Sequence, residues 1–138
     1  MNDRPILMAD DDADDRFLVQ AAFEDNKILN QILFFEDGEQ LLNYFSLGDV
    51  KSIPNLILLD LNMPKRDGRE VLKVLRSNVN WNDIPIIIFS TSNAPDDVVK
   101  AYQLGANCYI VKPSSYEELR DLMSSVHNFW LKPLTSRQ

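Results

Sequence analysis

Short apolar runs alternate with longer amphipathic stretches along the whole chain. Five of these runs are four or five residues long and continuous rather than alternating in polarity, at 6–9, 31–35, 56–59, 86–89 and 108–111. Continuous runs of this length, flanked by Pro and Asp, are typical of strands buried on both faces of a parallel sheet. The pattern therefore predicts five parallel strands.

Helical periodicity appears between and after these runs. It is clearest near the end of the chain, where apolar residues recur at i, i+3, i+4 and i+7. Ser115 and Glu118 form a capping-box pattern at the start of this helix. We expect Phe129 to complete the buried stripe, and the pattern leaves Trp130 open between a buried and an exposed position. The stripe consists of Leu119, Leu122, Met123, Val126, Phe129 and Trp130.

Five strands alternating with five helices predict a (βα)5 fold, a doubly wound α/β domain that occupies residues 1–138. Crossovers between parallel strands are almost always right-handed, so the helices should cover both faces of an open sheet. Ligands of such sheets bind at the carboxyl ends of the strands. The residues that follow the strands are therefore the first candidates for a site.

Composition and charge narrow the class of protein. A chain of 138 residues, 45% hydrophobic and 25% charged, suits one globular domain. The net charge of −7 argues against nucleic acid or an anionic membrane as a partner. No apolar run approaches the length of a membrane span. One Cys and an N-terminus without a signal-peptide pattern predict a cytoplasmic protein.

Four strand ends carry chemically active side chains. The first strand is followed by Asp10 and Asp11, the third by Asp60, the fourth by Ser90 and the fifth by Lys112. Singly, each residue is an ordinary turn, cap or surface residue. Together they supply hard oxygen ligands for Mg²⁺, a nucleophilic carboxylate and a cation that could hold phosphoryl oxygens. The combination predicts phosphoryl transfer.

The register of the first acidic pair is open, because five Asp residues fall between positions 10 and 15. The end of the apolar strand favours Asp10 and Asp11 over Asp11 and Asp12. Asp14 and Asp15 are expected in the first turn of a helix, where its dipole favours acidic side chains.

These residues carry a family resemblance. The acidic pair, the segment Leu-Asp-Leu-Asn-Met-Pro-Lys-Arg-Asp-Gly at 59–68, the hydroxyl of Ser90 and the segment Tyr-Ile-Val-Lys-Pro at 109–113 occur in this order. The sequence resembles the receiver domain of two-component response regulators over about residues 4–131, with a short tail at 132–138. The resemblance implies a flavodoxin-like sheet with strand order 2-1-3-4-5.

The resemblance also implies roles in the pocket. Asp60 is expected to be the phosphoacceptor, with Lys112 pairing first with its carboxylate and then with the phosphoryl group. Asp11 would bind Mg²⁺ directly, Asp10 would act mostly through water, and the backbone carbonyl of Asn62 would be a third ligand.

The resemblance also implies roles in the conformational change that follows phosphorylation and in the lifetime of the phosphoryl group. Ser90 would donate its hydroxyl to the phosphoryl group, and Tyr109 would change rotamer when Ser90 moves. Ser90 stands where Thr is common in the family, so the β-branch stiffness of Thr is absent. Asn62 and Ser92 occupy positions that tune dephosphorylation, and Pro113 is expected to follow a cis peptide bond.

The expected function is that of a single-domain response regulator phosphorylated by a sensor histidine kinase. Such a protein is a switch with slow autodephosphorylation rather than an enzyme that turns over a substrate. Seven residues follow the last helix, so the output is expected to be a surface, formed by the fourth helix, fifth strand and fifth helix. Residues 127–131 resemble the end of regulators that serve phytochrome-type histidine kinases, and those regulators tend to dimerise through that surface.

Two other functions use similar residues. A Mg²⁺-dependent phosphohydrolase with an aspartyl-phosphate intermediate needs the same carboxylates and lysine, but the chain lacks a cap domain and has Asn62 where a second Asp would stand. A flavodoxin-like FMN carrier needs hydroxyls and glycines in the first loop, which instead carries five carboxylates.

Overall fold

A computed structural model describes residues 4–46 and 53–131, so the predicted tail at 132–138 lies outside the described residues. Its five strands form one parallel sheet in the order β2-β1-β3-β4-β5, which confirms the predicted fold and strand order. The four or five residues of each strand agree closely with the predicted apolar runs. The strands are β1 (Ile6–Ala9), β2 (Ile32–Phe35), β3 (Leu56–Leu59), β4 (Ile86–Ser90) and β5 (Cys108–Val111).

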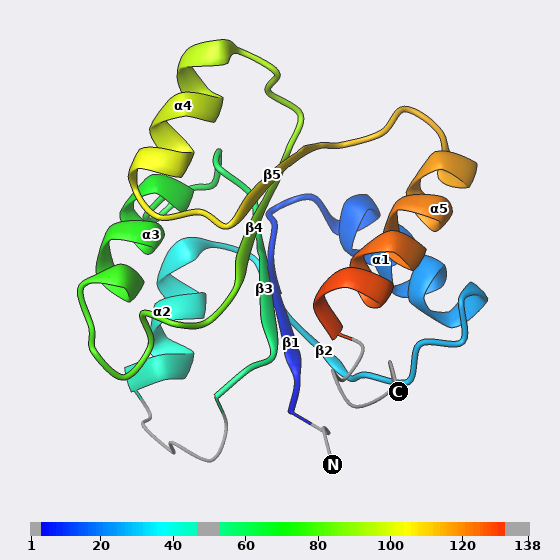
Figure 1. Ribbon diagram of the computed structural model, residues 1–138, viewed down its shortest axis with the longest axis horizontal. Coiled ribbons are helices and arrows are strands. Elements are labelled where there is room, and N and C mark those ends of the chain that lie inside the picture. Colours follow the sequence, from blue (N-terminus) through cyan, green and yellow to red (C-terminus); the bar gives the residue numbers. More distant parts are fainter. Residues whose placement is uncertain (1–3, 47–52, 132–138) are drawn as a thin grey trace.

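Helices cover both faces of the sheet (Figure 1). The helices α1 (Ala13–Asp25) and α5 (Tyr116–Val126) lie on one face, and α2 (Gly38–Ser46), α3 (Gly68–Arg76) and α4 (Pro95–Gln103) lie on the other. Among the residues that the structure describes, no helix is long and apolar enough to cross a membrane.

The two faces have separate cores, which explains why the strands are apolar throughout. In β1, Leu7 and Ala9 belong to the core under α2, α3 and α4, whereas Ile6 and Met8 belong to the core under α1 and α5. All four side chains are at most 1% exposed. Alternate residues of a strand point to opposite faces, so a strand covered on both sides must be continuously apolar.

Strand register places the residues after the strands side by side. Ala9 pairs with Leu59, and the Asp60 N–H donates to the Ala9 carbonyl at 3.0 Å. On the neighbouring ladder, the Lys112 N–H donates to the Ser90 carbonyl at 2.8 Å. The carboxyl edge of the sheet therefore gathers residues that are far apart in the sequence.

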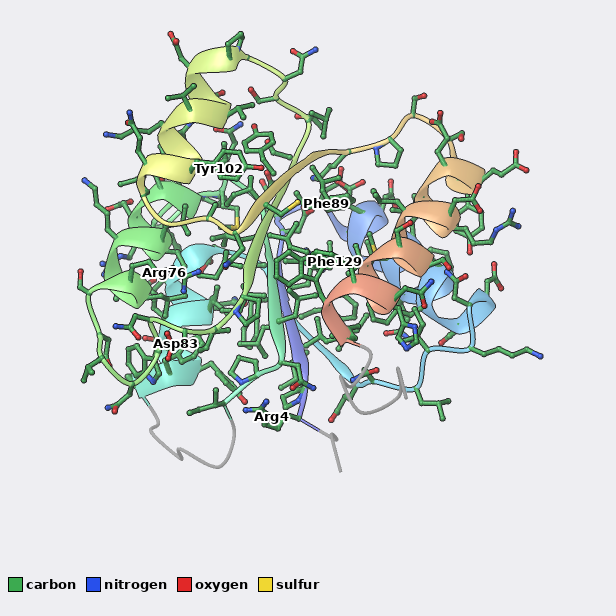
Figure 2. All side chains as sticks on the ribbon, in the orientation of Figure 1. Arg4, Arg76, Asp83, Phe89, Tyr102 and Phe129 are labelled. Carbon is green, nitrogen blue, oxygen red and sulfur yellow. The ribbon has the colours of Figure 1, made fainter. Side chains whose placement is uncertain are left out.

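The end of the last helix differs from the prediction. After Val126 the chain continues as a π-helical turn, η2 (His127–Leu131). Phe129 is 79% exposed and is labelled in Figure 2, while Trp130 is half-buried against the core under α1 and α5. The wider π-helical turn changes the angular spacing of side chains, so Phe129 leaves the stripe that an α-helix would bury. The expectation that Phe129 packs in the core is wrong.

Candidate functional site

The acidic run after β1 divides into residues with different roles. Asp10 is 1% exposed, and its Oδ1 accepts the Asp12 N–H at 2.9 Å. The guanidinium of Arg16 donates to the Asp10 backbone carbonyl at 2.7 Å. Asp11 is exposed, whereas Asp12 is the N-cap of α1, where its side chain accepts two backbone N–H groups of the first turn. Asp10 and Asp11 are thus the pair at the sheet edge.

Asp60 follows β3 and is 7% exposed. Its Oδ1 accepts the Asn62 N–H at 3.4 Å, while Asn62 itself is exposed. The start of α3 presses against this segment, because a Cβ added to Gly68 would lie 2.4 Å from the Asp60 carbonyl oxygen. Glycine at this position allows the close backbone approach that holds Asp60 at the edge.

The carboxylates of Asp10, Asp11 and Asp60 converge. One oxygen from each lies within 4.8 Å of the others. Burial raises the pKa of Asp10 from 3.8 to about 6, although contact with Lys112 acts in the opposite direction. The buried Oδ2 of Asp10 accepts no hydrogen bond from the described residues, but it forms an ion pair with the Lys112 ammonium, 2.8 Å away. A cluster of three carboxylates fits a hard divalent cation such as Mg²⁺.

Lys112 brings the positive charge of the site. Its Nζ lies 2.8 Å from Asp10 Oδ2, 2.7 Å from Asp15 Oδ2 and 3.1 Å from Asp60 Oδ2. Burial by itself would lower the pKa of Lys112, but the contacts with Asp10 and Asp15 more than offset this effect and raise it. The side chain also lies beside the ring of Phe89, with Nζ 5.8 Å from the ring centroid. Lys112 therefore remains charged in a mostly dry position.

The expected cis bond before Pro113 is absent. The structure has no cis peptide bond among its described residues, which include Lys112 and Pro113. For an X–Pro bond the trans form is the ordinary preference, and with it the Lys112 ammonium reaches all three carboxylates.

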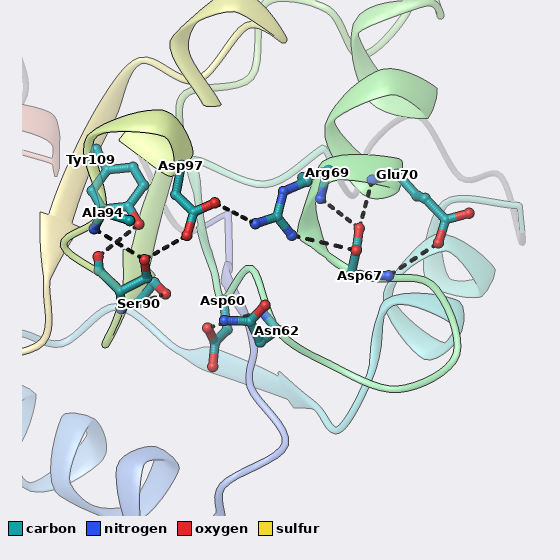
Figure 3. A network of polar contacts seen from close by, with 10 residues as sticks. Asp60, Asn62, Asp67, Arg69, Glu70, Ser90, Ala94, Asp97 and Tyr109 are labelled. Atoms are coloured by element: carbon teal, nitrogen blue, oxygen red, sulfur yellow. Dashed lines mark hydrogen bonds and ion pairs between the residues drawn. The ribbon is translucent and has the colours of Figure 1, made fainter. Parts of the chain in front are cut away.

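Ser90, the last residue of β4, and Tyr109 of β5 both contact Ser92 in the loop between β4 and α4. The fully buried Ser90 Oγ accepts the Ser92 N–H at 3.2 Å. The Tyr109 hydroxyl donates to the Ser92 backbone carbonyl at 2.8 Å. Figure 3 shows the tyrosine ring standing beside this loop. Movement of the loop would thus change the hydrogen bonds of both side chains.

The same loop is connected to α3 by charged side chains (Figure 3). Ser92 Oγ donates to Asp97 Oδ2 at 2.5 Å, and Arg69 donates to Asp97 Oδ1 at 2.9 Å. The hydrogen bonds from Ser92 and Arg69 hold the pKa of Asp97 below its usual value. Arg69 also lies 3.5 Å from Asp67, the N-cap of α3. The starts of α3 and α4 are therefore joined beside the pocket.

Sequence reasoning misses the contacts of Asp15, Arg69 and Asp97. Asp15 lies in the first turn of α1, as predicted, but its pairing with Lys112 spans 97 positions. Arg69 and Asp97 are 28 positions apart. No local periodicity connects residues on different elements, so a single sequence carries no signal for these pairs.

Comparisons with known proteins agree with the geometry. Residues 6–124 match the response regulator receiver domain family. The chain is 35% identical over 133 residues to the response regulator Rcp1 of Synechocystis sp., an alignment that covers 94% of this chain and 90% of Rcp1.

Two solved structures are also similar. One is the Mn²⁺-bound form of Rcp1, with 34% identity, a TM-score of 0.83 and coverage of 95% of this chain and 96% of that chain. The other is the phosphorylated cyanobacterial phytochrome response regulator RcpA, with 34% identity, a TM-score of 0.86 and the same coverage.

The chain belongs to the response regulator receiver domain family. It is a two-component signalling module, a class of phosphoacceptors rather than of enzymes that turn over a substrate. This assignment favours the receiver hypothesis over the phosphohydrolase and the FMN carrier. The carboxylates of Asp10, Asp11 and Asp60 form an acidic pocket and lie close enough together to share a metal ion, and the similar Rcp1 has been solved in a Mn²⁺-bound form.

Proposed function

We propose that Asp60 accepts a phosphoryl group from a sensor histidine kinase in a Mg²⁺-dependent reaction, and that phosphorylation changes the surface of the protein. The observation that carries this proposal is the convergence of three carboxylates and one buried ammonium at the carboxyl edge of the sheet. These groups combine a nucleophile, metal ligands and a cation, which are the parts that phosphoryl transfer requires.

The residues suited to hold Mg²⁺ are Asp11, Asp60 and the backbone carbonyl of Asn62, with Asp10 acting through water. When bound, Mg²⁺ supplies positive charge to the phosphoryl oxygens. The proposal is supported by the proximity of the carboxylates and by the excess of carboxylates over the Lys112 ammonium that contacts them. It is also supported by the Mn²⁺ in the structure of Rcp1.

In the transfer step, a carboxylate oxygen of Asp60 forms a bond to phosphorus as the phosphorus–nitrogen bond of the donor histidine breaks. Lys112, whose Nζ lies 3.1 Å from Asp60 Oδ2, neutralises charge on the transferred group. Slow hydrolysis of the resulting acyl phosphate returns the carboxylate. Asn62 and Ser92 flank the site and tune the rate of that hydrolysis.

The switch begins at Ser90. Its hydroxyl turns to donate to a phosphoryl oxygen, which changes the position of the loop that carries Ser92. The hydrogen bond from Tyr109 to the Ser92 carbonyl, 2.8 Å in this structure, then has to rearrange. Reversal of a 99:1 population requires a preference of about 5.5 kcal/mol, and several charge-assisted hydrogen bonds to the phosphoryl group could supply it.

The partner we propose is a phytochrome-type histidine kinase in the cytoplasm, because the structure of the similar RcpA is that of a phytochrome response regulator. The chain also forms homodimers through the face of α4, β5 and α5. That face exposes Val99, Tyr102 and Val111. Light scattering with and without beryllofluoride tests the dimer, and a monomer in both conditions would contradict it.

The phosphoacceptor is tested by incubation with acetyl phosphate and Mg²⁺, followed by mass spectrometry of the intact protein. We expect one added phosphoryl group in the wild type and none in Asp60→Asn. Asp83→Asn is the matched control, because it removes one carboxylate from the opposite edge of the sheet and should be labelled like the wild type. Labelling that persists in Asp60→Asn would overturn the assignment of Asp60.

A further inference from the structure

Asp15 is a fourth carboxylate beside the pocket, and it belongs to α1 rather than to a strand end. Of the three carboxylates around Lys112, it makes the shortest contact with Nζ, 2.7 Å from Oδ2. The Lys112 side chain is 9% exposed and that of Asp15 is 27% exposed, so the pair is largely shielded from water. Asp15 itself is not among the three carboxylates that could share a metal ion.

The other two partners of Lys112 have a second role. Asp10 and Asp60 both belong to the acidic cluster, and both contact the ammonium through their Oδ2 atoms. A bound ammonium competes with a divalent cation for these carboxylates and also repels it. Among the described residues that contact Lys112, only Asp15 can hold the ammonium without offering the same oxygens to the metal.

We propose that Asp15 is a positioning residue that holds the Lys112 ammonium on the α1 side of the pocket and so leaves Asp10 and Asp60 available to Mg²⁺. This inference rests on the proposed Mg²⁺-dependent function. It adds a residue to the pocket that acts through Lys112 rather than by touching the metal or the phosphoryl group.

Asp14 offers a matched control. It lies in the same first turn of α1, but it is exposed and its side chain is not among the partners of Lys112. Asp14→Asn and Asp15→Asn remove the same charge from nearly the same place along the helix, so both alter the helix dipole and the net charge alike. A difference between them measures the contact with Lys112.

The first test is calorimetric titration of the unphosphorylated protein with Mg²⁺. We expect Asp15→Asn to weaken the affinity for Mg²⁺ about fivefold and Asp14→Asn to change it less than about twofold. Asp15→Glu keeps the carboxylate and should restore most of the affinity. Equal affinities of Asp15→Asn and Asp14→Asn would overturn the proposal, as would failure of Asp15→Glu to restore binding.

The second test asks whether Asp15 acts through Lys112. In a Lys112→Met background the ammonium is absent, so Asp15→Asn should affect Mg²⁺ affinity no more than Asp14→Asn does. A loss of about fivefold in that background would overturn the proposal, because Asp15 would then act on the metal directly.

The third test is the rate of phosphorylation by acetyl phosphate as a function of Mg²⁺ concentration. Asp15→Asn should be slow at low Mg²⁺ and reach the wild-type rate at saturating Mg²⁺, a split that a general folding defect does not produce. A rate that stays low at saturating Mg²⁺ would contradict the proposal. If the wild type binds Mg²⁺ but is not phosphorylated, the proposed function fails, while the affinity measurements still decide the role of Asp15.

Discussion

The two edges of the sheet use polar residues in opposite ways. At the carboxyl edge, three carboxylates converge, and the Lys112 ammonium contacts two of them, Asp10 and Asp60. At the amino edge, Arg76 donates to the carbonyl oxygens of Gly105, Asn82 and Ile84 and to Asn107 Oδ1, at 2.7–3.2 Å. Figure 2 shows Arg76 beside the lower part of β4.

The two edges differ in the balance between their charged groups and the partners of those groups. The guanidinium of Arg76 joins the end of α3 to the segments before β4 and β5, and each of its nitrogens has an acceptor. At the carboxyl edge, the carboxylates of Asp10, Asp15 and Asp60 share the single ammonium of Lys112. Residues that conflict with local stability are expected at functional sites, and here the opposite edge supplies the stabilising hydrogen bonds.

The largest loss of stability is expected from a substitution at the amino edge of the sheet. Arg76→Ala should lower the free energy of unfolding by about 3 kcal/mol, because it removes four hydrogen bonds, two of which satisfy the partly buried carbonyls of Gly105 and Ile84. Urea denaturation measures the loss. Lys73→Ala, an exposed position on the same helix, should cost under about 1 kcal/mol. If both variants were equally stable, Arg76 would not be the connection that we describe.

At the carboxyl edge, removal of a charged side chain is expected to raise the free energy of unfolding in metal-free solution rather than lower it. The pKa of Asp10 is raised from 3.8 to about 6, so protonated Asp10 favours the folded state. That contribution is complete below about pH 4 and is lost as the pH rises through about 6. Asp10→Asn does not ionise, so it should be more stable than the wild type by up to about 3 kcal/mol at about pH 8.

Urea denaturation of the wild type and of Asp10→Asn across this pH range, with a chelator present, tests whether the variant is the more stable protein. The two curves should meet near about pH 4 and separate as the pH rises. Mg²⁺ should stabilise the wild type more than Asp10→Asn, because the variant has lost a carboxylate from the metal site. A variant that is less stable than the wild type at every pH would contradict the account of a strained acidic edge.

The smallest effect on the free energy of unfolding is expected in η2, the last element that the structure describes. Phe129 is 79% exposed, so Phe129→Ala should change the free energy of unfolding by less than about 0.5 kcal/mol. Val126 is 3% exposed, and Val126→Ala should cost about 2 kcal/mol through lost packing. Similar losses in thermal denaturation of the two variants would instead favour a buried Phe129.

Local patterns determined the fold and much of the site. Strands buried on both faces require continuous apolar runs, and these runs are visible without a structure. The chain direction then places Asp10, Asp60, Ser90 and Lys112 after strands of a parallel sheet, so their common edge follows from topology. The end of the first apolar run also favoured Asp10 and Asp11 as the pair at that edge, and the structure places Asp12 at the N-cap of α1.

Tertiary structure alone decided which side chains meet. The three-way contact of Lys112 with Asp10, Asp15 and Asp60 depends on how the tertiary structure brings α1 and the ends of β1, β3 and β5 together. The exposure of Phe129 depends on a π-helical turn that the apolar spacing does not specify. Periodicity along one element records the face that it buries. Contacts between elements are set by packing and register. They therefore become visible only in the folded structure and cannot be read from a single sequence.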